Sequence, residues 1–228
     1  MISEVSRIQS SLSLYAAGSK KRVTASSTLE HHTEDPAAKK QRRNHKYDIV
    51  IKPSDYVLAA FRANGVVIEE SRSKTEQNFV VPTQEMIETY TPEILNAIRS
   101  NDLETLKKLH SESKLNVNGC NKFGDSLLHL ACRRSHTAIV EFLLKEVKVD
   151  IRIRDDFHRT PLHDAAWTPT PNFDLVNFLI KECPEHLYMA DVRGFTPLDY
   201  VRKDDWGKWL RFLWERKAMF RPKHSPSE

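Results

Sequence analysis

The sequence predicts an all-α solenoid of about four stacked helix-turn-helix units, preceded by a disordered basic tail. One observation is a short phrase that occurs three times, as Ser126-Leu127-Leu128-His129, Thr160-Pro161-Leu162-His163 and Thr196-Pro197-Leu198-Asp199. Another is the period, because Thr160 follows Ser126 by 34 residues and Thr196 follows Thr160 by 36. A unit of that size cannot bury its own apolar face, so neighbouring units must stack.

Composition and length restrict the class of protein. The chain has 228 residues, of which 39% are hydrophobic and 29% charged, as in an ordinary soluble protein. No apolar run approaches the roughly 18 residues of a membrane span, and the N-terminus lacks the pattern of a secretion signal. We therefore expect an intracellular protein, nuclear or cytoplasmic, without a membrane partner. Three cysteines without a C-x-x-C pair argue against a disulfide framework or a four-cysteine zinc site.

The positive charge lies in residues 1–46. This segment has nine Lys or Arg and four Asp or Glu, a balance of +5. Subtraction from the totals of 35 and 31 leaves 26 basic and 27 acidic residues for 47–228, a balance of −1. The segment is polar with few large apolar residues, which predicts disorder. Nucleic-acid binding is therefore expected only through this tail.

Two basic clusters within the tail resemble a nuclear import signal. A solvated charge run in a disordered tail is the alternative interpretation, and both stay open. The clusters are Lys20, Lys21 and Arg22, and Lys39, Lys40, Arg42 and Arg43.

Residues 47–90 are expected to form an N-terminal extension that packs on the array. We predict a helix at about Asp55–Arg62, with Ser54 as its N-cap and Gly65 as its stop, followed by a short strand at Val66–Ile68. A segment of about 40 residues without disulfides or metal rarely holds its own core. The apolar residues of this extension must therefore pack on the array.

A degenerate first unit is predicted next, starting at Thr91-Pro92-Glu93. Thr91 is suited to cap a helix, and Pro92 to occupy its first position. Aligning this stretch with the later copies gives a helix pair at Pro92–Arg99 and Asp102–His110. Such a unit with a polar outer side is expected at the end of an array.

The repeated phrase has a physical meaning in each copy. Ser126, Thr160 and Thr196 are placed to cap the inner helix of each unit, and the prolines after the two threonines fit the first turn. With the following alanines and the Leu-rich second helix, residues of about 91–217 resemble the ankyrin repeat. The resemblance implies short β-turn or hairpin loops between units. It also implies that His129 and His163 bond to backbone between repeats.

The middle unit departs from this pattern. His158 stands where Gly124 and Gly194 indicate a positive φ. After Trp167 the chain reads Thr-Pro-Thr-Pro, which ends the inner helix and lengthens the interhelix turn by two residues. This insertion is where we expect a partner-specific feature.

The array is expected to end at about residue 217, with a polar tail over 218–228. Trp206, Trp209 and Trp214 fall at helical spacing in its last helix. They suit either the closure of the open apolar end or a partner anchor. Closure is the commoner use of such a helix.

Catalysis and metal binding find little support. His129, Cys132 and His136 have a spacing that can converge on zinc, but the first two have packing roles in a repeat. His163 with two nearby aspartates lacks a nucleophile, and neither G-x-S-x-G nor a phosphate-binding glycine loop occurs. We predict no enzyme activity, cofactor or metal.

The predicted function is that of a monomeric adaptor that binds another protein or a peptide. The alternative is a nuclear transcription- or chromatin-associated factor whose basic tail contacts nucleic acid. The resemblance implies a binding site on the concave face, made by the turn before each cap and the exposed side of the inner helices. Its aromatic and arginine residues have the composition of an interface centre. The candidates are Lys122, Phe123, Asp125, Arg133, Arg134, Asp156, Phe157, Arg159, Trp167, Val192, Arg193 and Phe195.

Overall fold

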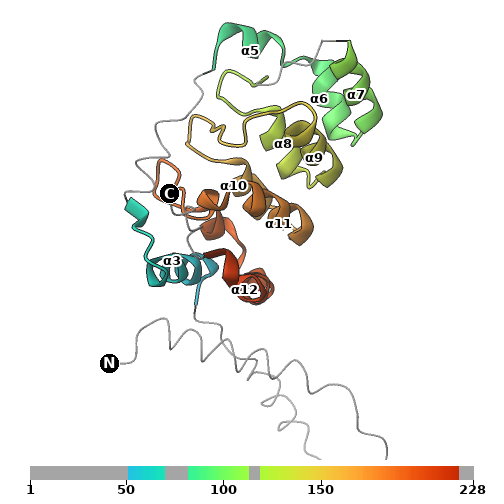
Figure 1. The fold of residues 1–228 in the computed structure, drawn as a ribbon. Coiled ribbons are helices and arrows are strands. Elements are labelled where there is room, and N and C mark those ends of the chain that lie inside the picture. The colour runs from blue at the N-terminus through green and yellow to red at the C-terminus, as the bar shows by residue number, and fades with distance from the viewer. Residues whose placement is uncertain (1–50, 70–81, 113–118, 221–228) are drawn as a thin grey trace, which may run out of the picture.

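The computed structural model describes residues 51–69, 82–112 and 119–220. Over these ranges the chain forms a stack of short helices, each pair lying on the next (Figure 1). The predicted all-α solenoid is confirmed. The predictions for the basic tail and its import clusters lie outside the described residues.

Four pairs of helical elements form the stack within the described ranges, as the sequence predicted. The first member of each pair, the inner helix, contacts the inner helix of the next pair. The pairs are α6 (Pro92–Arg99) with α7 (Leu103–Ser111), α8 (Leu127–Arg133) with α9 (Thr137–Lys145), α10 (Pro161–Ala166) with α11 (Phe173–Glu182), and the 3₁₀ turn η2 (Pro197–Tyr200) with α12 (Trp206–Glu215). The other elements are α3 (Pro53–Ala63), α5 (Gln84–Glu88), η1 (Pro184–Leu187), η3 (Lys203–Asp205) and η4 (Lys217–Phe220).

Polar side chains fix the start of the inner helices. The Ser126 hydroxyl accepts from the backbone N–H of His129 at 3.3 Å, and Thr91 accepts from Ile94 at 3.5 Å. In α10 the backbone N–H of Thr160 donates to His163 Nδ1 at 3.0 Å. These contacts satisfy amides that a helix cannot pair internally. The repeated phrase therefore acts as a cap in the structure.

The turns before the inner helices require a left-handed backbone. Gly124 and Gly194 have φ of 75° and 86°, and His158 has φ of 59°. A Cβ at Gly124 would lie 3.0 Å from the carbonyl oxygen of Arg154, so a side chain here would crowd the backbone of the next loop. His158 adopts the same conformation with a side chain, as the repeat alignment indicated.

The insertion in the middle unit lengthens the interhelix turn, by three residues where two were expected. Three residues, 134–136, join α8 to α9, whereas six residues, 167–172, join α10 to α11. Asn172 caps α11 through the N–H of Leu175, and its Nδ2 donates to the carbonyl oxygen of Ser135 at 3.2 Å. The longer turn is thereby fastened to the turn of the preceding unit.

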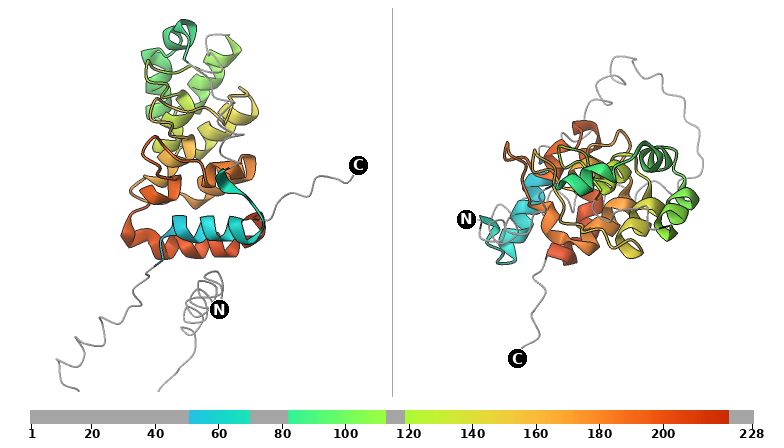
Figure 2. Two further views of the ribbon diagram at one scale, coloured as in Figure 1. Left: turned by 90° about the vertical axis from the view of Figure 1, so that its left-hand side faces the viewer. Right: turned by 90° about the horizontal axis from the view of Figure 1, so that it is seen from above.

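The N-terminal helix α3 lies at the far end of the stack, beside α12 and against η2 (Figures 1 and 2). It begins at Pro53 with Lys52 as N-cap, two residues earlier than predicted. Ser54 is buried, and its hydroxyl donates to Asp199 Oδ1 at 2.7 Å. Ser54 therefore serves a contact 145 residues away and does not cap the helix.

Two details near α3 differ from the sequence analysis or extend it. The prediction of a strand at Val66–Ile68 is wrong, because residues 66 and 67 are irregular and residues 68–69 are helical. Phe220 is buried and packs edge to face on Phe61, with ring centroids 5.3 Å apart. The end of the array is thus covered by α12, α3 and the chain up to Phe220 together. The domain boundaries after 46, 90 and 217 stay predictions.

Candidate protein-interaction surface

Three loops with one common geometry precede the inner helices α8, α10 and η2. In each loop the side-chain oxygen of an Asn or Asp accepts from the backbone N–H groups two and four residues further on. The distances are 2.8 and 3.1 Å for Asn121, 3.0 and 2.8 Å for Asp155, and 2.8 and 2.9 Å for Asp191. Each oxygen holds its loop closed. We call these loops the fingers; they are residues 121–125, 155–159 and 191–195.

The fingers are joined to one another through their backbones. The N–H of Asp156 donates to the Phe123 carbonyl at 2.8 Å, and the N–H of Val192 donates to the Phe157 carbonyl at 3.0 Å. Because the same contact recurs from one finger to the next, the three tips have a fixed spacing. They form one continuous edge that these backbone hydrogen bonds hold together.

The fingertips carry exposed apolar side chains. Phe123, Phe157, Val192 and Phe195 are each about half exposed, at 51%, 50%, 55% and 47%. Trp167, at the end of α10, is 54% exposed. These five account for all but one of the large apolar side chains that are exposed in the described ranges, the other being Val67. The four side chains on the fingertips form a recurring apolar edge of a kind that is typical of an interaction surface.

Two of the candidate arginines are fixed by aspartates of their own fingers. Arg159 Nε donates to Asp155 Oδ2 at 2.7 Å, and Arg193 Nη2 donates to Asp191 Oδ2 at 3.0 Å. Tyr200, which the sequence analysis did not select, accepts from Arg193 at 2.6 Å and donates to Asp191 at 2.7 Å. Hydrogen bonds from these neighbours lower the pKa of Asp191 although burial raises it.

Arg133 is engaged within the array. Its guanidinium bonds to Asp125 at 2.6 Å and to both carboxylate oxygens of Asp164 at 3.3 and 3.2 Å. Burial raises the pKa of Asp164, and the Arg133 charge opposes that rise. Arg133 thus joins two repeats and is half-buried, whereas its neighbour Arg134 is exposed. Among the candidate charges, Lys122 and Asp156 are also exposed.

The repeated histidines link one unit to the next, as the resemblance implied. His129 Nε2 lies 2.9 Å from the Arg159 carbonyl oxygen, and His163 Nε2 lies 3.2 Å from that of Phe195. With Nδ1 accepting at the cap, Nε2 carries the proton that bonds to the carbonyl. Burial lowers the pKa of His163 to about 4, so it stays neutral at pH 7. These histidines hold the fingers in place.

Metal ligation has no geometric basis in the described part of the chain. No three His, Cys, Asp or Glu side chains there gather in a way that can hold an ion. Cys132 is buried, and burial raises the pKa of its thiol well above the usual value. The carboxylate of Asp199 already accepts hydrogen bonds from Thr196 and Ser54.

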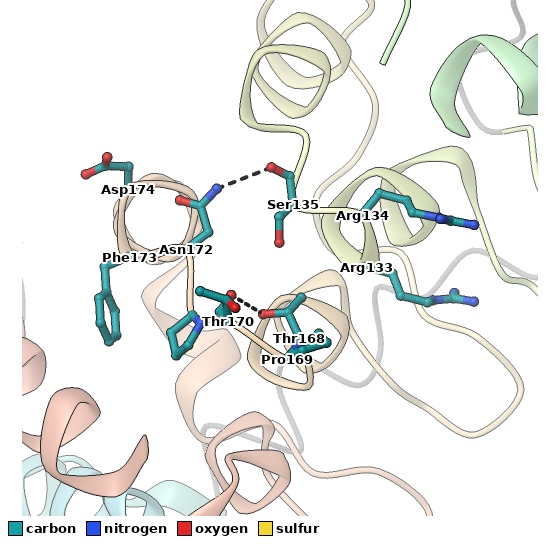
Figure 3. A pocket seen from close by; sticks show the side chains of 10 residues that line it. Arg133, Arg134, Ser135, Thr168, Pro169, Thr170, Asn172, Phe173 and Asp174 are labelled. Atoms are coloured by element: carbon teal, nitrogen blue, oxygen red, sulfur yellow. Dashed lines mark hydrogen bonds between the residues drawn. The ribbon is translucent and has the colours of Figure 1, made fainter. Parts of the chain in front are cut away.

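The Thr-Pro-Thr-Pro insertion borders an open pocket of about 690 Å³ (Figure 3). One wall is 133–135, at the end of α8, and the other is 168–174, which includes the insertion. The Thr168 hydroxyl donates to the carbonyls of Ala165 and Thr170, and so fixes the bend of the inserted turn. In Figure 3 Phe173 lies on the side of the pocket opposite Arg133 and Arg134. Partner binding at the pocket or the fingers stays a prediction.

Comparison with known proteins agrees with this architecture. The family model described as ankyrin repeats, in three copies, matches residues 94–191. The SMC5-SMC6 complex localization factor protein 1 of Homo sapiens is 29% identical over 123 residues, which is 47% of this chain and 11% of that protein. The Bos taurus protein of that name is 33% identical over 86 residues, or 38% and 8% of the two chains. A probable serine/threonine-protein kinase of Dictyostelium discoideum is 29% identical over 69 residues, or 30% and 7%.

The match covers about a tenth of the length of these curated relatives. Within the part of the chain that the structure describes, no helix has the length and apolarity needed to span a bilayer.

Proposed function

This chain carries ankyrin repeats over residues 94–191, and we propose that it is an adaptor that binds another protein through its three fingers and Trp167. The observation that carries the proposal is the row of half-exposed aromatic rings on successive fingers. Exposing these rings to water is unfavourable in the free chain, and burying them against a partner recovers that free energy. The backbone contacts between fingers support tight binding, since a rigid surface loses little entropy on association.

The relatives indicate what kind of partner to examine first. Two of them are named as localization factors of the SMC5-SMC6 complex. By this likeness we propose that the adaptor helps to place a protein assembly, in the nucleus. Subunits of that complex are the first candidates for capture.

The test is a triple variant, Phe123→Ala, Phe157→Ala and Trp167→Ala, used as bait in an affinity capture from nuclear extract. These side chains are exposed, so their truncation leaves the core intact. Arg193 is kept because it holds its finger through Asp191. We expect partners captured by the wild-type chain to be lost.

The control is a double variant on the outer helices, Glu141→Ala with Lys181→Ala, both exposed. Circular dichroism verifies that all baits are folded. If the folded triple variant captures the same proteins as this control, the finger surface is not the binding site.

A second function rests on the charge of the tail, which is +5 over residues 1–46. In this proposal the tail contacts nucleic acid while the repeats hold a protein. DNA binding that weakens steeply with salt and disappears on deletion of 1–46 is the expected result. Binding that is absent, or that salt does not change, excludes it.

A further inference from the structure

Each fingertip carries a cation against an aromatic ring. Lys122 Nζ lies 4.9 Å from the centroid of Phe123, Arg159 Cζ lies 5.3 Å from Phe157, and Arg193 Cζ lies 5.1 Å from Phe195. Such pairs hold a charge close to an apolar surface. The same combination of charge and ring therefore recurs three times along one edge.

The carboxylates that balance two of these cations face inward. The side chains of Asp155 and Asp191 are 3% and 0% exposed, whereas those of Arg159 and Arg193 are 29% and 57% exposed. Each aspartate is also occupied by two backbone N–H groups of its own finger. Lys122 has no ion pair with any described residue. Apart from the exposed carboxylate of Asp156, the outward side of the fingertips is thus positive and aromatic, although the pairs beneath are neutral.

We propose that the fingers bind an extended acidic segment of a partner protein, with carboxylate and apolar side chains at about every third residue. The spacing follows from the stack. Packed helices lie about 8–10 Å apart, which sets the distance between fingers. An extended chain rises about 3.3 Å per residue, so three residues cover one finger. The inference rests on the proposed function and specifies the chemistry of its partner.

One exposed carboxylate on the fingers opposes this chemistry and makes the proposal testable. Asp156 is exposed and has no ion pair with a described residue. It is the second residue of the finger 155–159, just as Lys122 is the second residue of the finger 121–125. Its side chain should repel an acidic segment and attract a basic one. Removing its charge therefore has opposite consequences for the two kinds of partner.

The experiment selects a phage-displayed library of random twelve-residue peptides on the immobilised full chain. Affinities of the selected peptides are then measured by fluorescence anisotropy. We expect enrichment of Asp and Glu together with aromatic or aliphatic residues at a spacing of three. Lys122→Glu should weaken binding about three- to tenfold, and Asp156→Asn should strengthen it about twofold, as expected for exposed charge pairs. Lys181→Glu on α11 is the matched control for charge and should have no effect.

Enrichment of Lys and Arg, no enrichment at all, or weaker binding of acidic peptides by Asp156→Asn would each overturn the proposal. An unchanged affinity in Lys122→Glu would do the same. These outcomes leave the adaptor function standing if the triple aromatic variant still loses its captured protein. If that variant loses nothing, the adaptor function itself fails.

Discussion

His186 is a buried histidine whose stability effect can be predicted in direction and size. Its side chain is 1% exposed, and its Nδ1 has no hydrogen-bond partner among the described residues. Burial lowers its pKa to about 3, and the nearby His163 and Arg154 act in the same direction. The folded protein therefore cannot accept a proton here at mildly acidic pH.

The perturbation is His186→Leu. At pH 7 the change removes an unpartnered buried polar atom, a gain of about 1–3 kcal/mol, from which repacking subtracts up to about 1.5 kcal/mol. The folded pKa lies below the unfolded value of about 6.5. As pH falls below 6.5 the unfolded chain takes up a proton that the folded chain does not, so the wild type loses about 1.4 kcal/mol per pH unit at this site. At pH 5 the advantage of the leucine variant should have grown by about 2 kcal/mol.

Urea unfolding followed by tryptophan fluorescence at pH 7 and pH 5 measures this difference. His158→Asn is the control, because the His158 side chain is exposed and Asn tolerates its positive φ. If the free energy of unfolding of His186→Leu falls between pH 7 and pH 5 as steeply as that of the wild type, the reasoning is refuted.

Two further substitutions test the fastening of the array, both by the free energy of unfolding in urea. Asp191→Asn removes the charge from a carboxylate that Arg193 and two backbone amides contact, and should cost about 2 kcal/mol; a change below about 0.5 kcal/mol would contradict this. Asn172→Ala removes both a helix cap and the bond to Ser135, and should cost about 1–2 kcal/mol; an unchanged midpoint would show that the inserted turn is not fastened there.

The sequence predicts this fold well where information is local. Caps, turns and helix pairs depend on residues within about four positions of one another. The same local pattern can therefore be recognised in each of the three copies of the phrase. The left-handed φ at His158 followed from alignment with two glycines, and the bonds of His129 and His163 from the resemblance. The same periodicity did not reveal that the fourth inner element is only a 3₁₀ turn, at Pro197–Tyr200.

Long-range partners could not be predicted in this way. Ser54 has the residue type and position of an N-cap, yet its hydroxyl bonds to Asp199 because α3 packs on η2. The local sequence pattern of residues 53–63 does not indicate which end of the array the helix α3 covers. The sequence likewise did not reveal that buried aspartates of the fingers bind Arg159 and Arg193. These two arginines are therefore paired cations and not free ones.

The position of α3 gives the repeated phrase a different partner in its last copy. In the first two copies the residue after Leu is histidine, which bonds to the next finger. In the third copy it is Asp199, and the next layer of the stack is α3, whose Ser54 donates to it. The N-terminal helix therefore occupies the place of a fifth unit and caps the array from the other end of the chain.

Deletion of residues 1–69 should therefore destabilise the C-terminal end of the array. Three side chains of α3, Tyr56, Val57 and Phe61, are at most 5% exposed, and each buried side chain of this kind contributes about 1.5–3 kcal/mol. Ordering the helix offsets part of that, since short helices are marginal alone, and a net loss of about 2–4 kcal/mol is expected. Deletion of residues 1–50 is the matched control, because it keeps α3. Equal unfolding midpoints of the two truncated chains in urea would show that α3 is not a cap. Because α3 packs on α12, we expect the longer deletion to have the lower midpoint and a tryptophan emission that is shifted to the red.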